Sequence, residues 1–284
     1  MPKYWPSNWN RGTSTPSDNN GGTTQRFEQF INCLGQIPGE SWVKAVNQTP
    51  SCKLLRPLSQ VWPFGRFATL YALGGLNNYQ LKGRAEVSYW PKILPLIEHV
   101  PIPQDSHELG DRLLPFYKTE RMGASKIKRL ERFVESRLCR QIWDSDAMNV
   151  AGKFLAIWPE MARTMNQKQE MKTIVFAMKC LAYALLLVNE NDFDFGNIPI
   201  PVDSRIRELS RRLGLPSCDD DTERARWNWV LDRIRYSNSE ITMIHLDSIL
   251  WQIGTLSKQK VKTHFLQLGT QTDLAESIAE VIDG

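Results

Sequence analysis

The sequence has few of the residues that hold metal ions or form disulfides. Five cysteines are scattered over 284 residues, and no two of them form the C-x-x-C pair of zinc ribbons and iron–sulfur sites. An odd, scattered set is typical of free thiols in a reducing cytoplasm. The four histidines, also without ligand spacing, are His99, His107, His245 and His264. We therefore expect neither a metal ion nor any other cofactor.

The chain also lacks a long apolar run and a strong charge of either sign. Its longest uninterrupted apolar stretch is the nine residues from Cys180 to Val188, about half the length of a membrane span. Residues 1–24 have neither the basic start nor the apolar core of a signal peptide. These absences predict a cytoplasmic protein with no membrane partner. The net charge of +4 permits a polyanionic partner but does not require one.

A third absence is the alternation of apolar and polar residues that marks a half-buried strand. From Gln25 onward the apolar spacing is helical, with Pro, Gly or Asn between the segments, so the expected fold is all-α. Breaks at Pro101, Pro103 and Gly123 predict two helical lobes that flank an active-site cleft. The predicted helices cover residues 25–35, 66–80, 86–99, 107–117, 124–142, 146–165, 170–189, 204–214, 220–236, 245–255 and 272–282.

The first 24 residues differ in composition from the rest. They are rich in Asn, Ser, Thr, Gly and Pro, a composition that buries too little apolar surface to order itself. We expect residues 1–24 to form a flexible tail and residues 25–284 to form one all-helical module.

Basic side chains crowd the segment that begins at Gly123. Lys126, Lys128, Arg129 and Arg132 alternate with the apolar residues of an amphipathic helix. Two interpretations of this pattern remain open. The basic face is either an ordinary solvated surface with local glutamate partners, or it contacts the phosphates of DNA without reading sequence.

A lysine stands at the start of the most apolar helical segment. Lys172 shares one helix face with Phe176 and Lys179. A lysine becomes a nucleophile when its pKa is lowered, and partial desolvation or a neighbouring cation such as Lys179 acts in that direction. The alternative is that Lys172 only extends its ammonium from the first helical turn into water.

Two carboxylates follow in positions that suit a binding site. Asp203 comes after an extended, proline-containing segment, where it can cap the next helix and hold an ionised oxygen toward a cleft. Asp247 and Trp251 lie one helical turn apart. This second pair is either core packing or one wall of a base pocket, with a carboxylate for N–H groups and an indole for stacking.

Three segments together resemble one family, the archaeal 8-oxoguanine DNA glycosylases, a divergent branch of the helix-hairpin-helix glycosylase superfamily. The segments read KTIVF from Lys172, IPIPVDSR from Ile198 and HLDSILW from His245. Their order agrees with that of the family, and so does their separation, with 31 residues from Lys172 to Asp203 and 44 from Asp203 to Asp247. Residues 123–133 resemble the basic helix of the family more loosely.

The resemblance implies a DNA glycosylase that is also an abasic-site lyase. Lys172 would form the Schiff base and Asp203 would be the catalytic carboxylate, within a helix-hairpin-helix region at about residues 146–214. The substrate would be double-stranded DNA with a flipped modified base, 8-oxoguanine in the first instance, and β-elimination would then nick the strand. We expect the chain to act as a monomer.

The resemblance also implies how the flipped base is held. Phe176 and Trp251 would stack on its two faces, and Asp247 would make a polar contact with it. Trp90 resembles a pocket tryptophan of the family more loosely. The glutamine with which the family contacts the base has no clear counterpart, since the spacing of Gln48 does not agree.

Two other functions remain open at this point. The first keeps the chemistry but changes the substrate to another modified base, such as a hypermodified base of phage DNA in antiviral defence. The second is a helical DNA-binding module without catalysis. A serine hydrolase is not indicated, because the sequence has no G-x-S-x-G motif.

Overall fold

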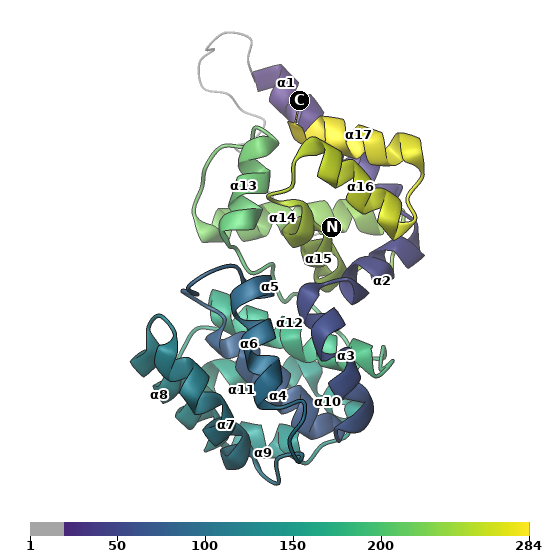
Figure 1. The fold of residues 1–284 in the computed structure, drawn as a ribbon. Helices are drawn as coiled ribbons and strands as arrows, with labels where there is room; N and C mark the ends of the chain where they lie inside the picture. The colour runs from purple at the N-terminus through teal and green to yellow at the C-terminus, as the bar shows by residue number, and fades with distance from the viewer. Residues whose placement is uncertain (1–19, 284) are drawn as a thin grey trace.

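The computed structural model describes residues 20–283 (Figure 1). These residues form helices and connecting segments, with no strand among them, so the all-α prediction is confirmed. Helix α1 begins at Asn20, earlier than the predicted start at Gln25. Residues 1–19, and with them most of the expected flexible tail, lie outside the described part of the chain.

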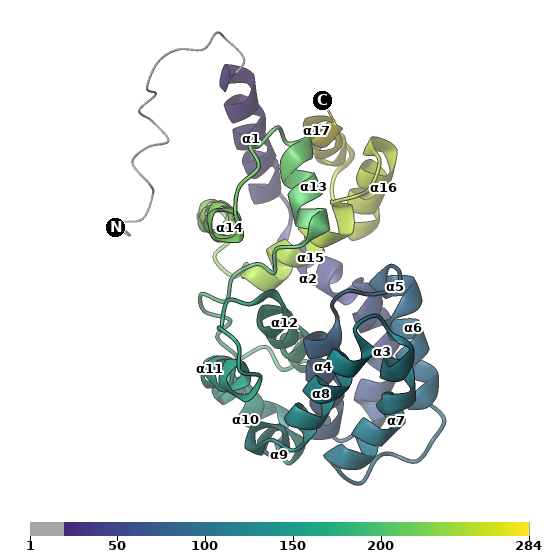
Figure 2. The same cartoon turned by 90° about the vertical axis from the view of Figure 1, so that its left-hand side faces the viewer.

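The helices form two lobes, one above the other in Figures 1 and 2. The lower lobe comprises α3 (Pro50–Val61), α4 (Phe64–Asn77), α5 (Ala85–Ser88), α6 (Trp90–Ile93), the 3-10 helix η1 (Leu94–Leu96), α7 (Ser106–Thr119), α8 (Gly123–Val134), α9 (Arg137–Trp143), α10 (Ala147–Gly152), α11 (Phe154–Thr164) and α12 (Lys172–Leu187). The upper lobe comprises α1 (Asn20–Gly35), α2 (Gly39–Asn47), α13 (Ser204–Arg212), α14 (Asp220–Arg235), α15 (Met243–Ile253), α16 (Lys258–Leu268) and α17 (Thr272–Asp283).

The upper lobe is built from both ends of the described chain. Helix α1 packs against α17 and α14, so the lower lobe is an insertion between α2 and α13. The guanidinium of Arg26 on α1 donates to the backbone carbonyls of Val281 and Ile282 on α17, at 2.5 and 2.9 Å. Two segments from opposite ends of the sequence therefore complete one lobe.

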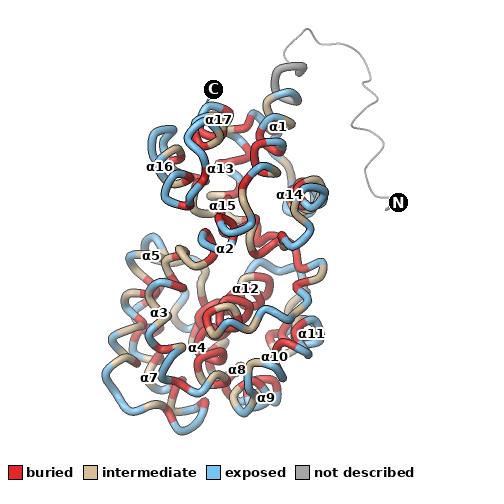
Figure 3. The backbone as a smooth tube through the Cα atoms, turned by 90° about the vertical axis from the view of Figure 1, so that its right-hand side faces the viewer, coloured by how far each residue is buried: buried red, intermediate tan, exposed pale blue. Residues whose placement is uncertain are grey.

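Helix α12 is the central helix of the lower lobe. Apolar residues surround its axis on nearly all sides, which is the pattern of a helix buried in a core, and Figure 3 shows it almost entirely in the colour of buried residues. It packs most extensively against α4. The two helices approach so closely at Gly75 that a Cβ there would lie 2.7 Å from the Cα of Ala177.

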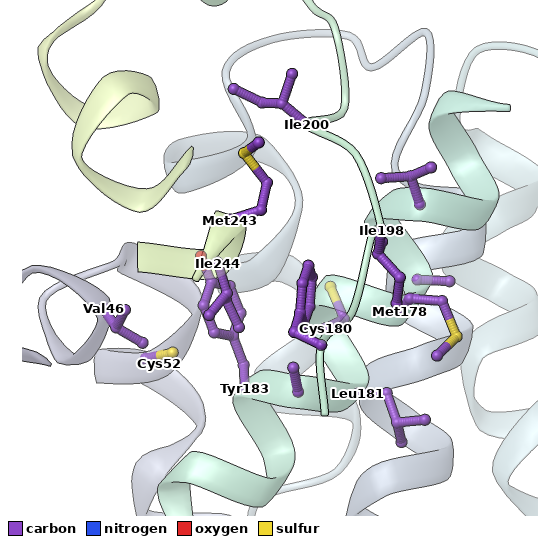
Figure 4. Close-up of a cluster of buried hydrophobic side chains, with 14 of the residues drawn as sticks. Val46, Cys52, Met178, Cys180, Leu181, Tyr183, Ile198, Ile200, Met243 and Ile244 are labelled. Carbon is purple, nitrogen blue, oxygen red and sulfur yellow. The ribbon is translucent and has the colours of Figure 1, made fainter. Parts of the chain in front are cut away.

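The lobes share a continuous hydrophobic core where they meet. Figure 4 shows buried side chains from α2, α3, α12, the extended segment before α13 and the start of α15 gathered at this junction. They include Val46, Cys52, Tyr183, Ile200 and Ile244, each buried. Apolar packing therefore fixes the start of α15 next to the middle of α12.

The structure corrects several predicted helix boundaries. The predicted helix over 124–142 is two helices, because Ser136 accepts a hydrogen bond from the Cys139 amide at 3.0 Å and caps α9. The predicted helix over 146–165 is likewise divided, into α10 and α11, at Lys153. Helices α2, α3 and α16 were not predicted. In α3, Pro50 occupies the first turn, where proline is tolerated.

We expect Gly75→Ala to destabilise the protein by about 1–3 kcal/mol, because the added methyl group meets the backbone of α12 and the helices must separate. The matched control is Gly152→Ala, where a Cβ meets nothing within 4 Å. At position 152 the higher helix propensity of alanine should stabilise the protein, by up to about 1 kcal/mol. Urea denaturation measures both free energies of unfolding, and equal effects of the two substitutions would contradict the close crossing of α4 and α12.

Candidate active site

A cavity of about 320 Å³ lies at the junction of the two lobes, lined by residues of both. The sequence analysis assigned six residues to catalysis and base binding, and all six line this cavity. The lower lobe contributes Lys172, Phe176 and Trp90, and the upper lobe contributes Asp203, Asp247 and Trp251. The cavity thus brings together residues as distant in the sequence as Trp90 and Trp251, which are 161 positions apart.

Lys172 is the first residue of α12 and is exposed where it lines the cavity. The preceding turn joins α11 and α12 into a helical hairpin. The indole of Trp158 donates to the carbonyl of Gln169 at 2.9 Å, and the hydroxyl of Thr173 donates to the side chain of Gln167 at 2.9 Å. These two bonds fix the hairpin on both sides of Lys172, so its backbone is held while its amine reaches the cavity.

Asp203 is the N-cap of α13, as the sequence predicted. Its Oδ1 accepts hydrogen bonds from the amides of Arg205 and Ile206, at 2.9 and 3.1 Å. Both bonds use the same oxygen, so Oδ2 is left to the cavity. The carboxylate thus lies beside the partial positive charge of the α13 N-terminus.

Lys179 and Asp247 form an ion pair across the lobes, from α12 to α15, and both side chains are buried. Burial disfavours the ammonium, but the carboxylate of Asp247 outweighs this effect and raises the pKa of Lys179 above its ordinary value. Lys179 was expected to act on Lys172 as a neighbouring cation. That expectation is corrected, because Asp247 compensates the charge. The second oxygen of Asp247, Oδ1, is buried without a hydrogen-bond partner among the described residues.

Trp251 is stacked against an arginine that the sequence analysis did not assign to the site. The guanidinium carbon of Arg205 lies 3.8 Å from the centroid of the Trp251 ring. The same guanidinium donates to Glu86 on α5 at 2.5 Å, which makes a second ion pair between the lobes. Arg205 and Glu86 both line the cavity.

The basic helix α8 divides into structural and exposed cations. Lys126 is fully buried and pairs with Glu120 at 3.2 Å, and Arg129 donates to the carbonyl of Leu76 at 3.0 Å. Both cations face the ring of Tyr79, at 5.3 and 5.4 Å from its centroid. The expectation that Lys126 contacts phosphate is wrong, because a buried, paired ammonium cannot reach DNA. Arg129 is largely engaged in holding the segment after α4.

The other two basic residues of this helix remain available. Lys128 and Arg132 are exposed, and they lie one turn apart on α8. Arg132 also donates to the carbonyl of Met165 at 3.2 Å, which links α8 to the hairpin that carries Lys172. Any phosphate contact of α8 therefore falls to these two side chains, close in the structure to the hairpin that carries Lys172.

Several residues of the cavity gave no clear signal in the sequence. They are Thr49, Pro50 and Ser51 at the start of α3, the stretch from Asn78 to Glu86, and Tyr183, Pro201 and Arg205. Arg205 belonged to the segment that carried the family resemblance, and this was its only signal. Gln80 has a positive φ of 46°, a strained conformation that no local sequence pattern predicted.

Neither a metal site nor a membrane span is found in the part of the chain that the structure describes. Residues 20–283 contain no group of three or more His, Cys, Asp or Glu side chains arranged to hold a metal ion. No helix within this range is long and apolar enough to cross a bilayer.

The fold is that of a solved DNA glycosylase. The crystal structure of an 8-oxoguanine DNA glycosylase from Pyrobaculum aerophilum, complexed with 8-oxoguanosine, superposes with a TM-score of 0.66 at 18% identity, covering 90% of this chain and 96% of that one. The sequence then gives the family. Residues 31–280 match the AGOG family of N-glycosylase/DNA lyases, so the chain belongs to that family and is an N-glycosylase/DNA lyase.

Similar proteins occur in several archaea. The N-glycosylase/DNA lyase of Methanopyrus kandleri is 29% identical over 213 residues, covering 74% of this chain and 81% of that protein. The N-glycosylase/DNA lyase of Thermococcus kodakarensis is 26% identical over 192 residues, covering 66% and 67%. These matches and the fold confirm the resemblance found in the sequence.

The histidine at the start of α15, the helix that carries Asp247 and Trp251, makes the free energy of unfolding depend on pH. His245 forms a capping box with Thr242, and burial lowers its pKa to about 4. An unfolded histidine takes up a proton below its ordinary pKa of about 6.5, and the folded one does so only near 4. This contribution to stability is therefore complete above pH 6.5 and is lost as the pH falls toward 4.

We expect His245→Gln to weaken the dependence of the free energy of unfolding on pH between 6.5 and 4.5, measured by urea denaturation at several pH values. The exposed His107, changed to Gln, serves as the matched control and should leave that slope as it is. A His245→Gln slope equal to that of the parent protein would show that the capping histidine is not held neutral.

Proposed function

We propose that this enzyme excises 8-oxoguanine from double-stranded DNA and cleaves the resulting abasic site through a Schiff base on Lys172. One observation carries the proposal. The amine of Lys172 and the carboxylate of Asp203 come from different lobes and line the same cavity as Phe176 and Trp251. That cavity offers a nucleophile, an anion and aromatic rings to a single flipped nucleotide.

Base flipping precedes the chemistry, because a duplex hides the glycosidic bond. Flipping costs a few kcal/mol in unstacking and unpairing. Stacking on an aromatic side chain returns roughly 1–3 kcal/mol per base. Arg205 covers one face of the Trp251 ring, so the base would stack on the face left free, with Phe176 as the second ring.

The chemical step begins with attack of the neutral Lys172 amine on C1′ of the sugar. The bond between C1′ and the base nitrogen breaks, and its electron pair leaves with the base, which takes up a proton. Asp203 stabilises the positive charge that develops on the sugar and helps the proton transfer. Loss of the amine proton and opening of the sugar leave a Schiff base. Removal of a C2′ proton then expels the 3′ phosphate by β-elimination.

The choice of 8-oxoguanine depends on the family resemblance and on the fold that this chain shares with the 8-oxoguanine DNA glycosylase of Pyrobaculum aerophilum. The contacts that would read the base are those of Phe176, Trp251, Asp247 and Trp90, which line the cavity together. Another modified base, including a hypermodified base of phage DNA, would use the same Lys172 chemistry.

We also propose that the chain acts as a monomer in the cytoplasm. The support for a monomer is that one chain supplies the cavity residues of both lobes. The support for the cytoplasm is the free state of the five cysteines, none of which is paired in a disulfide.

We expect borohydride to trap a covalent adduct between the enzyme and a duplex that contains 8-oxoguanine. Lys172→Gln should abolish the adduct, because the variant has no amine, and Asp203→Asn should slow its formation by at least tenfold. Lys168→Gln is the matched control, since Lys168 is an exposed lysine on the turn that precedes Lys172. Gel electrophoresis measures the adduct.

Each outcome of this experiment is informative. An adduct on abasic DNA but none on 8-oxoguanine would keep Lys172 and reject the base. An adduct that survives Lys172→Gln would reject the assigned nucleophile. No adduct on either substrate would favour the DNA-binding module without catalysis.

We expect Lys128→Glu and Arg132→Glu to weaken DNA binding to a similar extent on any sequence, because both side chains are exposed on α8. Replacing either residue with a neutral one should lower the slope of log K against log salt by about 1, as for loss of one phosphate contact. Fluorescence anisotropy at several salt concentrations measures the slope. Lys118→Gln, an exposed lysine on α7, is the control, and an equal change there would contradict the contact.

A further inference from the structure

The cavity contains a second carboxylate whose free oxygen none of the proposed steps uses. Glu86 lies on α5 of the lower lobe and lines the cavity. Its Oε1 accepts the hydrogen bond from Arg205 at 2.5 Å. Its Oε2 is buried and has no hydrogen-bond partner among the described residues. A buried carboxylate oxygen without a donor is unfavourable, so a group that enters the cavity with an N–H would stabilise it.

Arg205 holds Glu86 beside the ring on which the base is proposed to stack. The guanidinium stacks on Trp251 at 3.8 Å and donates to the carbonyl of the same residue at 3.4 Å. The backbone of Arg205 is fixed as well, since a Cβ at Gly254 would lie 2.6 Å from its carbonyl oxygen. Glu86, Arg205 and Trp251 thus form one rigid cluster that joins the lobes.

Asp247 presents a second free acceptor in the same cavity. Its Oδ1 is also buried without a partner in the described part of the chain, while its other oxygen pairs with Lys179. Both free atoms are oxygens of carboxylates, which accept hydrogen bonds and do not donate them when ionised. The cavity therefore suits a base with N–H donors at two or more positions.

We propose that Glu86 is a specificity-determining residue of the base pocket, in which Oε2 accepts a hydrogen bond from an N–H of the flipped base. Arg205 is its positioning residue. The inference rests on the proposed glycosylase function. It identifies the preferred base as a guanine-type lactam, because such a base carries an amide N–H and an amino group at adjacent positions. An adenine-type base offers only the amino group on its corresponding edge, and a thymine-type base offers a single N–H.

The test compares single-turnover excision of 8-oxoguanine and of 8-oxohypoxanthine, which is 8-oxoguanine without its amino group, from the same duplex by the full chain and by Glu86→Gln. Glutamine can keep the bond to Arg205 through its carbonyl oxygen, but it places an NH₂ group where the free oxygen was. We expect the ratio of the two rates, which favours 8-oxoguanine in the parent protein, to fall at least tenfold in the variant. Cleavage of a preformed abasic site, which has no base to contact, should change less than threefold.

Controls separate this role from a structural one. Glu40→Gln, an exposed glutamate on α2, should leave the ratio unchanged. Thermal melting should show that Glu86→Gln remains folded, and Glu86→Ala should lower the ratio as well. If both Glu86 variants slow all three substrates equally, Glu86 only ties the lobes together and the inference is overturned.

The failure of this inference and that of the proposed function have different signatures. If the parent protein excises 8-oxoguanine but Glu86→Gln leaves the ratio of the two rates unchanged, only the role of Glu86 is rejected. A parent protein that cleaves neither 8-oxoguanine nor abasic DNA, or that keeps its activity after Lys172→Gln, would reject the proposed function and this inference with it.

Discussion

The buried ion pair between Lys179 and Asp247 is the interaction on which the cavity depends. It links the central helix of the lower lobe to the helix of the upper lobe that carries Trp251. A hydrogen bond of 2.8 Å between Tyr183 and Ser248 lies beside it, one turn further along α12 and one residue further along α15. Removing one partner of such a pair leaves an uncompensated buried charge, at a cost of about 3–5 kcal/mol. Together with the apolar packing at the junction, this pair holds the aromatic rings of both lobes around one cavity.

Local physics allowed the principal residues to be predicted from the sequence. Asp203 follows an extended segment and precedes a helix, which is the pattern of a capping residue, and it does cap α13. Lys172 was conspicuous because it begins an otherwise apolar helix. Lys126 was misjudged, although its register places it one turn before the buried Leu130, on the apolar face. The helical spacing of the apolar residues distinguishes the buried Lys126 from the exposed Lys128.

What the sequence could not supply were contacts between distant segments. The pair of Arg205 with Glu86 joins residues 119 positions apart, and the pair of Lys179 with Asp247 joins residues 68 positions apart. Such partners are set by the packing of whole helices and not by any local preference. For the same reason the continuous basic pattern of residues 124–142 concealed the break at Ser136, where a side-chain cap outweighs periodicity.

The insertion of the lower lobe into the upper one determines the order in which the protein can be completed during synthesis. Helices α1 and α2 are synthesised before the lower lobe, yet the bonds from Arg26 reach Val281 and Ile282, which are synthesised after it. The lower lobe, with Lys172, can fold on the nascent chain while the first two helices wait for their partners. The segments that carry Asp203, Asp247 and Trp251 also follow the lower lobe in the sequence. Lys172 therefore meets Asp203, Asp247 and Trp251 only after the segments that follow the lower lobe have been synthesised.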